Sequence, residues 1–417
     1  MAWQLEIHHI DVGQGDATLI VVREVAPFLE DAAPIIRSVL IDGGKLNKGA
    51  DVHQYLNTTV NLNNLDIMIA THYDEDHYNG LRYLLNHASL LYNNTIIFDQ
   101  GEPGSITVKR ERSQTFRTTD ISGRDDDYIR YLAAIRSQGN RQRITADVKS
   151  SRNFVSTAEQ QAGWRNPHWL VNQEVLWHGF AGEVPAGAPI MTCIAANQYI
   201  RGAGAANRVQ SGQSVDPKNE KSLAFLVQFN NFKYYLGGDI ETTQEDHIMT
   251  NLNPNDNDAG RILAMKASHH GSDRSTSASF VNCLRPSAAF ISCGYNNSFD
   301  HPRQEVLNNL EDCVDLQHYY LTEDRDDTAF NARVGAVGGP APNIAAAYTP
   351  KAFVAGSWGP PDDAAPNKQG GNIVLTVTED QSNRLPNGVL LLGQSRFTVT
   401  GYSADSVAAG PFNNAHT

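Results

Sequence analysis

The sequence predicts an α/β fold in which several strands deliver metal-binding side chains to one edge of a sheet. The apolar residues 65–70 have the length and composition of a buried strand, and residues 72–77, which follow directly, contain two histidines and three carboxylates. Residues 79–85 then have the pattern of a helix that packs back onto the sheet. Open α/β sheets place their sites at the carboxyl ends of strands, so this segment is the first candidate site.

Two further segments have the same arrangement. Residues 232–237 form an expected strand that is followed by Asp239, and residues 261–266 form another that is followed by the histidine pair at 269–270. A rigid sheet can bring such distant positions together at one cation site. A solvated acidic turn is the alternative explanation for residues 72–77, and the two downstream segments argue against it.

Several motifs together resemble those of the metallo-β-lactamase-fold hydrolases, and most closely the soluble hydrolase domain of ComEC-type DNA-uptake proteins. Each motif alone is a weak signal, but in order they cover residues 5 to about 90 and 215 to about 325. They are Ile10-Asp11-Val12-Gly13-Gln14-Gly15-Asp16, Leu40-Ile41-Asp42-Gly43-Gly44, His72-x-Asp74-x-Asp76-His77, Asn219-Glu220-Lys221-Ser222, Gly237-Gly238-Asp239, Lys266-Ala267-Ser268-His269-His270-Gly271-Ser272 and Ser292-Cys293-Gly294-Tyr295-Asn296-Asn297-Ser298-Phe299-Asp300-His301-Pro302. The resemblance implies an αββα metallo-β-lactamase sandwich, here with a large insertion and a C-terminal β-hairpin extension.

The resemblance also implies two metal positions that share Asp239 as a bridging ligand. One ion would be held by His72, Asp74 and Asp239, and the other by Asp76, His77 and one of two adjacent histidines. Those two are His269 and His270; the second, directly before Gly271, is the first choice, and the pair stays unresolved.

The first position is poor in nitrogen compared with the family pattern. Asp74 stands where a histidine is usual, and the further lone histidine of the family has no counterpart, because His87, His168 and His178 lie in unrelated contexts. Carboxylate ligands favour harder ions such as manganese or magnesium, whereas the histidines keep zinc open. We therefore expect two divalent ions, zinc or manganese, with weaker binding at the first position.

Divalent ions lower the pKa of bound water to about 7, and a pair of ions suits phosphodiester hydrolysis. Asp76 and His301 are the expected catalytic residues, and the resemblance assigns His301 to phosphate binding or leaving-group protonation. Asp42 is expected to hydrogen-bond a ligating histidine, or else to be an ordinary turn residue. The expected substrate contacts, each with a structural role as its alternative, are Gln14, Lys266, Ser272 and Asn296.

Composition sets the outer bounds. The chain of 417 residues divides into residues 1–100 and 213–330, the two halves of the hydrolase-like domain, residues 101–212, an insertion, and residues 331–417, a Gly/Pro-rich linker with a β extension. The insertion contains an expected helix over residues 127–136. No signal peptide and no membrane span are predicted, which favours a cytoplasmic protein without a membrane partner. The four cysteines are expected to be free thiols.

The net charge of −13 argues against indiscriminate binding to nucleic acid. Residues 109–152 are an exception, with eleven basic and six acidic residues. This segment is either a basic lid that guides a polyanion or a solvated surface. We expect a metal-dependent hydrolase of phosphodiester bonds in DNA or a nucleotide-derived substrate. The alternatives are a lactone or thioester hydrolase of the same fold and a catalytically degenerate metal scaffold.

Overall fold

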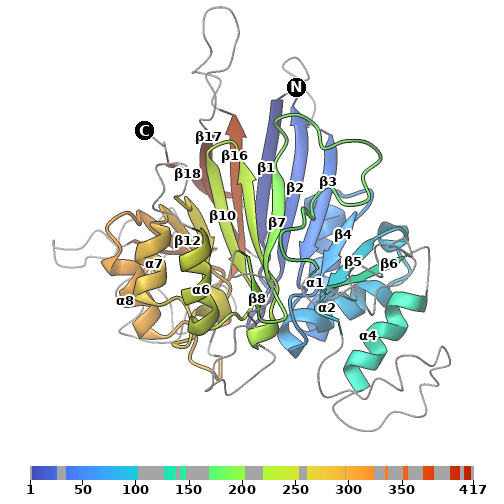
Figure 1. Cartoon of the computed structure of the whole chain (residues 1–417), viewed down its shortest axis with the longest axis horizontal. Helices are drawn as coiled ribbons and strands as arrows, with labels where there is room; N and C mark the ends of the chain where they lie inside the picture. The colour runs from blue at the N-terminus through green and yellow to red at the C-terminus, as the bar shows by residue number, and fades with distance from the viewer. Residues whose placement is uncertain are drawn as a thin grey trace, which may run out of the picture.

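In the computed structural model, two nine-stranded sheets face each other and helices cover their outer faces (Figure 1). The arrangement is the αββα sandwich that the sequence predicts. The structure describes residues 2–25, 34–101, 126–137, 141–146, 169–201, 219–252, 261–295, 297–323, 334–336, 351–355, 370–379, 395–403 and 408–414.

The first sheet has the order β18-β17-β16-β1-β2-β3-β4-β5-β6. Its strands run antiparallel from β18 to β3 and parallel from β3 to β6. Their bounds are β1 Ala2–His9, β2 Thr18–Val25, β3 Ile35–Ile41, β4 Ile67–Ile69, β5 Ile96–Asp99, β6 Gln142–Thr145, β16 Gly371–Glu379, β17 Ser395–Ser403 and β18 Ala408–Asn414.

The second sheet has the order β14-β15-β13-β12-β11-β10-β9-β7-β8. Strands β10 to β15 pair in parallel, whereas β7, β8 and β9 complete the sheet with antiparallel pairs. The bounds are β7 Ile190–Ala196, β8 Tyr199–Ile200, β9 Ala224–Phe229, β10 Phe232–Gly237, β11 Ala264–Lys266, β12 Ala288–Ile291, β13 His318–Leu321, β14 Val334–Ala336 and β15 Ala352–Val354.

Successive side chains of a strand point to opposite faces of the sheet. The buried apolar residues therefore form three layers, one between the sheets and one under the helices on each outer face. On β2, Ile20 and Val22 point into the core between the sheets, whereas Leu19 and Val21 contact the helices outside. The first sheet is covered by α1 Gly49–Gln54, α2 Glu75–Asn86 and α4 Asp126–Ser137, and the second by α6 Thr242–Leu252, α7 Ala278–Leu284 and α8 Gln304–Asp312. Short single-turn helices are η1 Leu46–Lys48, η2 Tyr55–Thr59, η3 Leu90–Tyr92, η4 Asn219–Lys221 and η5 Ser268–Gly271.

The insertion and the C-terminal extension are built into the sheets. Helix α4 and strand β6 of the insertion extend the first half of the sandwich, and β7 and β8 extend the second sheet. The expected C-terminal hairpin is present as β16 and β17, and β16 pairs with β1 inside the first sheet, whose edge strand on this side is β18. The third strand, β18, had no signal in the sequence because residues 408–414 are mostly small or polar.

The four cysteines are free, as expected, and Cys193, Cys293 and Cys313 are buried. Within the described residues, no helix combines the length and the apolar character that crossing a bilayer requires.

Candidate metal centre

The three ligand-rich segments meet between the two sheets. Residue His72 follows β4, and α2 begins within the same segment, so that Asp76 and His77 occupy its first turn. Asp239 follows β10 in the other sheet, and residues 269–270 lie in η5, which follows β11. Distances below 4 Å join all three segments, so the structure brings the predicted metal residues together at one place.

The two carboxylate oxygens of Asp239 face two different groups of side chains. Its Oδ2 lies 3.7 Å from His72 Nε2 and 3.6 Å from His269 Nε2. Its Oδ1 lies 3.2 Å from His77 Nε2 and 3.7 Å from His270 Nε2. The two adjacent histidines therefore do not compete for one place, because each faces a different oxygen.

Two further carboxylates complete these groups. Asp74 Oδ2 lies 3.7 Å from His72 Nε2, on the Oδ2 side of Asp239. Asp76 lies 3.9 Å from His77 Nε2 and 3.7 Å from His270 Nε2, on the Oδ1 side. Below, the Oδ2 group means His72, Asp74 and His269, and the Oδ1 group means Asp76, His77 and His270.

The backbone conformation of η5 directs the imidazoles of His269 and His270 toward different oxygens of Asp239. His269 (φ 51°), His270 (φ 54°) and Gly271 (φ 79°) are three consecutive residues in the left-handed region. A residue with a Cβ pays about 1–2 kcal/mol for this conformation, and such strain is typical of functional sites. The His269 amide donates to Gly238 O at 3.1 Å, which ties this turn to the segment that carries Asp239.

Asp42, which is expected to hydrogen-bond a ligating histidine, lies next to His77. Its Oδ2 lies 2.8 Å from His77 Nδ1, so His77 can donate to Asp42 and leave Nε2 free toward the centre. Asp42 also accepts from the Thr71 amide at 2.8 Å and from the Thr71 hydroxyl at 2.6 Å. The loop that follows β3 packs closely against α2. A Cβ added to Gly80 of α2 would lie only 1.7 Å from Gly43 O of this loop.

A buried ion pair lies behind the Oδ1 group. Asp16 Oδ2 lies 2.6 Å from Lys266 Nζ, and the carboxylate lies 3.8 Å from His77 Nδ1 and 3.6 Å from His270 Nδ1. Asp16 thus faces the nitrogens that point away from Asp239. Lys266 is only 1% exposed, so its burial and its pairing favour a structural role over the expected substrate contact. Asp16 was missed as a candidate because only the fold brings it to the histidines.

The pKa shifts of His77 and Asp239 indicate that the centre is stabilised by positive charge. Burial lowers the pKa of His77, but the carboxylates of Asp239 and Asp42 outweigh it and raise the pKa well above its ordinary value. Burial raises the pKa of Asp239, but His77, His269 and His270 outweigh it and hold the pKa well below the usual range. The proton that the raised pKa keeps on His77 therefore stands in for the positive charge of a metal.

The donor set fits divalent metal ions. His72 Nε2 and Asp239 Oδ1 are buried atoms without a hydrogen-bond partner among the described residues. Ligands that bind one tetrahedral ion at 2.0–2.2 Å lie about 3.3–3.6 Å apart, close to the separations on both sides of Asp239. Asp16, His77, Asp239 and His270 also place one potential ligand atom each within 4.8 Å of one another. Because Asp16 faces the Nδ1 side of the histidines, it lies behind the atoms that meet at Asp239.

His301 borders the centre. Its ring centroid lies 5.4 Å from that of His269 and 6.2 Å from that of His270. Burial and these two histidines lower the pKa of His301 to about 3, so in the metal-free protein it is a neutral hydrogen-bonding group.

Two of the other expected substrate contacts, Ser272 and Gln14, form hydrogen bonds within the protein. Ser272 is 3% exposed, and its hydroxyl accepts from the Arg274 amide at 3.3 Å within a local turn. Gln14 Oε1 accepts from the Gly294 amide at 3.3 Å, which joins the loop after β1 to the loop after β12. Asn296 lies outside the described residues.

Other histidines and tryptophans of the sequence lie elsewhere. His87 packs against His53 with ring centroids 4.0 Å apart, and the ring of His178 packs against Phe98. Trp177 is buried between the sheets, where it donates to Pro189 O at 2.7 Å, so it is no exposed stacking surface. Trp164 and His168 lie outside the described residues.

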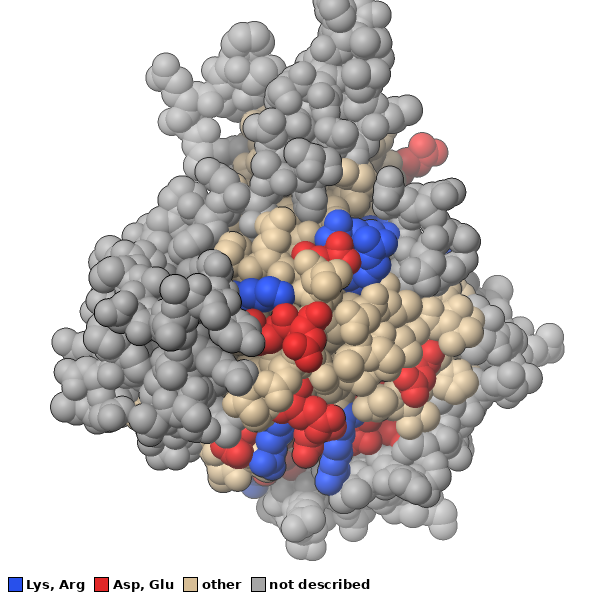
Figure 2. Space-filling view, turned by 90° about the vertical axis from the view of Figure 1, so that its left-hand side faces the viewer, with Lys and Arg blue, Asp and Glu red and all other residues tan. Residues whose placement is uncertain are grey.

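The basic segment of the insertion is only partly described, and two of its arginines are structural. Arg143 forms two hydrogen bonds with Asp99, and Arg141 donates to the carbonyls of Leu85, Tyr92 and Ala134. Both are 5% exposed, so neither can contribute to a basic lid. Figure 2 shows the opposite side of the molecule from α4, the side on which α7 and α8 lie in Figure 1, and the described acidic and basic side chains are interspersed there.

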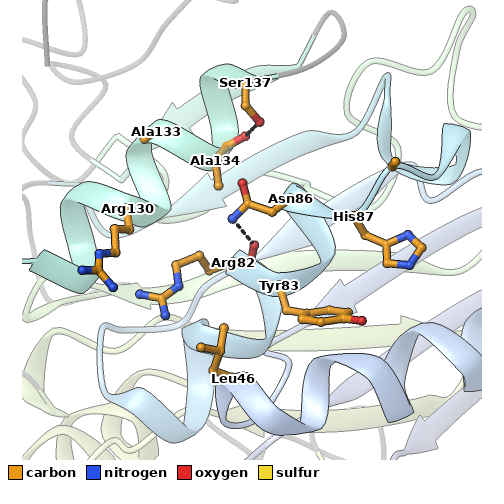
Figure 3. A pocket seen from close by; sticks show the side chains of 10 residues that line it. Leu46, Arg82, Tyr83, Asn86, His87, Arg130, Ala133, Ala134 and Ser137 are labelled. Carbon is orange, nitrogen blue, oxygen red and sulfur yellow. Dashed lines mark hydrogen bonds between the residues drawn. The ribbon is translucent and has the colours of Figure 1, made fainter. Parts of the chain in front are cut away.

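A pocket of about 630 Å³ lies apart from the centre, between α2 and α4 (Figure 3). It is lined by Leu46, Arg82, Tyr83, Asn86, His87, Ala88, Arg130, Ala133, Ala134 and Ser137. Arg82 forms an ion pair with Asp127, and the Asn86 amide donates back to Arg82 O at 3.0 Å. The polar groups of this pocket thus serve the packing of the two helices.

Comparison with known proteins finds similarity over parts of the chain. No protein-family model matches the chain. It is 37% identical over 105 residues to ComE operon protein 3 of Bacillus subtilis and 30% identical over 92 residues to competence protein ComA of Neisseria gonorrhoeae. These matches cover 25% and 22% of this chain and 13% of each relative.

Similar solved structures include a metal-dependent hydrolase of the β-lactamase superfamily and the short form of human tRNase Z. The first is 14% identical with a TM-score of 0.36, over 74% of this chain and 93% of that one. The second is 12% identical with a TM-score of 0.30, over 68% and 90% of the two chains. Segments of the chain are therefore similar to ComE operon protein 3 and competence protein ComA, and the chain spans about an eighth of the length of each.

Proposed function

We propose that this protein is a metal-dependent phosphodiesterase or nuclease that acts on DNA or a nucleotide-derived substrate. The observation that carries the proposal is the bridging position of Asp239 between the Oδ1 and Oδ2 groups. A first ion would be held by His72, Asp74 and His269 with Asp239 Oδ2. A second would be held by Asp76, His77 and His270 with Asp239 Oδ1.

Bound divalent ions would supply a hydroxide at neutral pH and positive charge for a phosphoryl group. The residues of the chain hold the reaction in place. Asp42 orients His77 through Nδ1, and Asp76 borders the histidines at 19% side-chain exposure, where it can accept a hydrogen bond from the attacking water. His301, neutral beside His269 and His270, can hydrogen-bond the substrate or the leaving group.

A phosphodiester suits this centre better than a neutral ester. Two ions and several imidazoles favour a substrate that carries negative charge at the reacting atom. Lactones and thioesters, the alternative substrates, carry no negative charge at the reacting group. With His269 in the Oδ2 group, each position would have two histidines and one aspartate besides Asp239, so neither is poorer in nitrogen, and this mixed donor set suits manganese or zinc.

The test is hydrolysis by full-length protein that has been stripped with chelator and reloaded with manganese, zinc or magnesium. The substrates are plasmid DNA, a single-stranded oligonucleotide, a lactone and a thioester. We expect phosphodiester cleavage that Asp76→Ala and Asp239→Asn abolish. Asp246→Asn, the same type of change at an exposed position of α6, is the matched control and should keep wild-type activity.

The two alternatives give different results in the same assay. Cleavage of the lactone or thioester alone would identify a hydrolase of carbonyl substrates. Bound metal without turnover of any substrate would identify a degenerate scaffold.

A further inference from the structure

A rigid turn presents an exposed aromatic ring beside the candidate centre. The described part of the turn comprises residues 294–295 and 297–301, and the side chain of Asn297 holds it together: Oδ1 accepts from the amides of Phe299 (3.2 Å) and His301 (2.9 Å). Its Nδ2 donates to Gly294 O at 2.8 Å and to His301 O at 2.6 Å. Asp300, in the left-handed region with φ 60°, completes the turn. The position of Phe299 is therefore set by hydrogen bonds and does not depend on burial of its ring.

Phe299 continues a series of rings that begins at the centre. The ring of His301 lies beside His269 and His270, and the Phe299 ring stacks on His301 at a centroid distance of 5.7 Å and an interplanar angle of 24°. Phe299 is nevertheless 51% exposed, and it is the only aromatic residue among the exposed large hydrophobic side chains of the described residues. One part of the ring is packed on His301, and much of the rest faces solvent.

We propose that Phe299 is a stacking surface for a nucleobase adjacent to the phosphodiester bond in the centre. This inference rests on the proposed function and specifies its substrate as a strand with unpaired bases. A base stacked on Phe299 would extend the ring series outward while its phosphate lies near His301 and Asp239. Stacking on an aromatic ring is tolerant of sequence, because every base has a π-face.

The charge of the described surface supports a contribution from stacking. Nucleic-acid binding that depends on phosphate contacts needs clustered Lys and Arg. The chain has a net charge of −13, and Arg303, near the turn, is paired with Asp300 at 3.3 Å. A base contact can supply affinity that such a surface does not.

The test compares two single-stranded oligonucleotides of equal length and charge, one with natural bases and one in which abasic tetrahydrofuran units replace the central nucleosides. For the wild-type protein with manganese, we expect KM to be at least tenfold lower for the natural strand. In Phe299→Ala the two KM values should converge, and Phe299→Trp should restore the difference. Val314→Ala, at a residue that is 93% exposed, is the control that should keep the wild-type ratio.

The outcomes separate the two claims. Equal KM values for both strands in the wild type, or an unchanged ratio in Phe299→Ala, would overturn the stacking role and leave the diesterase proposal intact. Absence of cleavage of both strands by protein that cleaves plasmid DNA would overturn the stacking role alone, whereas absence of phosphodiester cleavage on every substrate would overturn the proposed function and the stacking role with it.

Discussion

Asp239 links the two halves of the candidate centre through its two oxygens. Each oxygen meets two imidazole nitrogens at distances between 3.2 and 3.7 Å. Such a buried carboxylate is stabilised only by positive charge nearby, from protons or from metal ions. The residues around it, Asp42 above all, determine which imidazole nitrogen is available for that charge.

Asp42→Asn should weaken metal binding by about 10–100-fold. The asparagine amide can no longer hold the Nδ1 proton of His77 in the way a carboxylate does, so the orientation of its Nε2 is lost. Competition with a chromophoric chelator measures the affinity. Asp66→Asn, at the opposite end of β4, is a matched control and should leave the affinity unchanged. An unchanged affinity in Asp42→Asn would show that the hydrogen bond does not orient a ligand.

Metal affinity should rise with pH through the neutral range. The pKa of His77 is raised well above its ordinary value, so its imidazole carries two protons at pH 7 in the metal-free protein and must lose one to bind a metal. Below that pKa, each pH unit should strengthen binding about tenfold per displaced proton. The lowered pKa of Asp239 adds no change in this range, because its carboxylate is already ionised.

Chelator competition between pH 6 and 8, together with calorimetry in two buffers of different ionisation enthalpy, measures this proton release. A pH-independent affinity and no buffer-dependent heat would contradict the assignment of His77 as a ligand.

At the scale of elements, the centre depends on short connections between strand ends and helices. The turn that carries residues 268–276 is anchored from α6, where Glu245 accepts from the Thr276 amide through both oxygens, at 2.8 and 2.9 Å. Burial raises the pKa of Glu245 to about 7, although the Thr276 hydrogen bonds oppose that shift. A protonatable group thus holds the loop that bears both histidines of η5.

Glu245→Gln should reduce the pH dependence of stability. With its pKa raised in the folded state, Glu245 contributes stability that is complete below its unfolded pKa near 4.5 and is lost as the pH rises through about 7. A shift of this size corresponds to about 3 kcal/mol. The stability of wild type relative to Glu245→Gln should therefore fall by about that amount between pH 4.5 and pH 8.

Urea unfolding at several pH values measures the difference, with Glu183→Gln, the same type of change at an exposed position, as control. A difference between wild type and Glu245→Gln that stays constant with pH would contradict the role of this carboxyl group.

At the scale of the whole molecule, the sequence predicts what depends on local pattern. The apolar strands, the helices α2 and α4 and the C-terminal hairpin follow from residues that are neighbours in the chain. The convergence of the ligand segments was predicted from their positions after strands, but for one sheet, whereas β4 lies in the first sheet and β10 and β11 lie in the second. The pairing of β16 with β1 could not be predicted, because no local signal connects positions more than 360 residues apart, such as Ile7 and Leu375. The partition of His269 and His270 depends on two left-handed backbone conformations, which histidine rarely adopts.

The ion pair of Asp16 with Lys266 could not be predicted from the sequence for a related reason. In the sequence, Asp16 belongs to a glycine-rich turn and Lys266 ends a strand, and each type of residue is usually exposed in such places. Only the closed sandwich buries both and brings them to 2.6 Å.

The C-terminal strands should be an integral part of the core. Leu375 on β16 is fully buried between the sheets, so Leu375→Ala should lower the free energy of unfolding by about 2–5 kcal/mol. Val314→Ala, at an exposed position after α8, should change it by less than about 0.5 kcal/mol. Denaturant unfolding compares the two, and an equally small effect of both would mean that the extension is not part of the folded unit.

The most direct test of a shared two-metal centre is the metal content of the protein. Wild type, Asp239→Ala and Asp246→Asn are loaded with manganese or zinc, freed of unbound ions by gel filtration, and analysed by inductively coupled plasma mass spectrometry, with circular dichroism to verify folding. We predict two ions per chain in wild type and in Asp246→Asn, and loss of both in Asp239→Ala. A folded wild type without stoichiometric metal, or Asp239→Ala that retains two ions, would contradict the account.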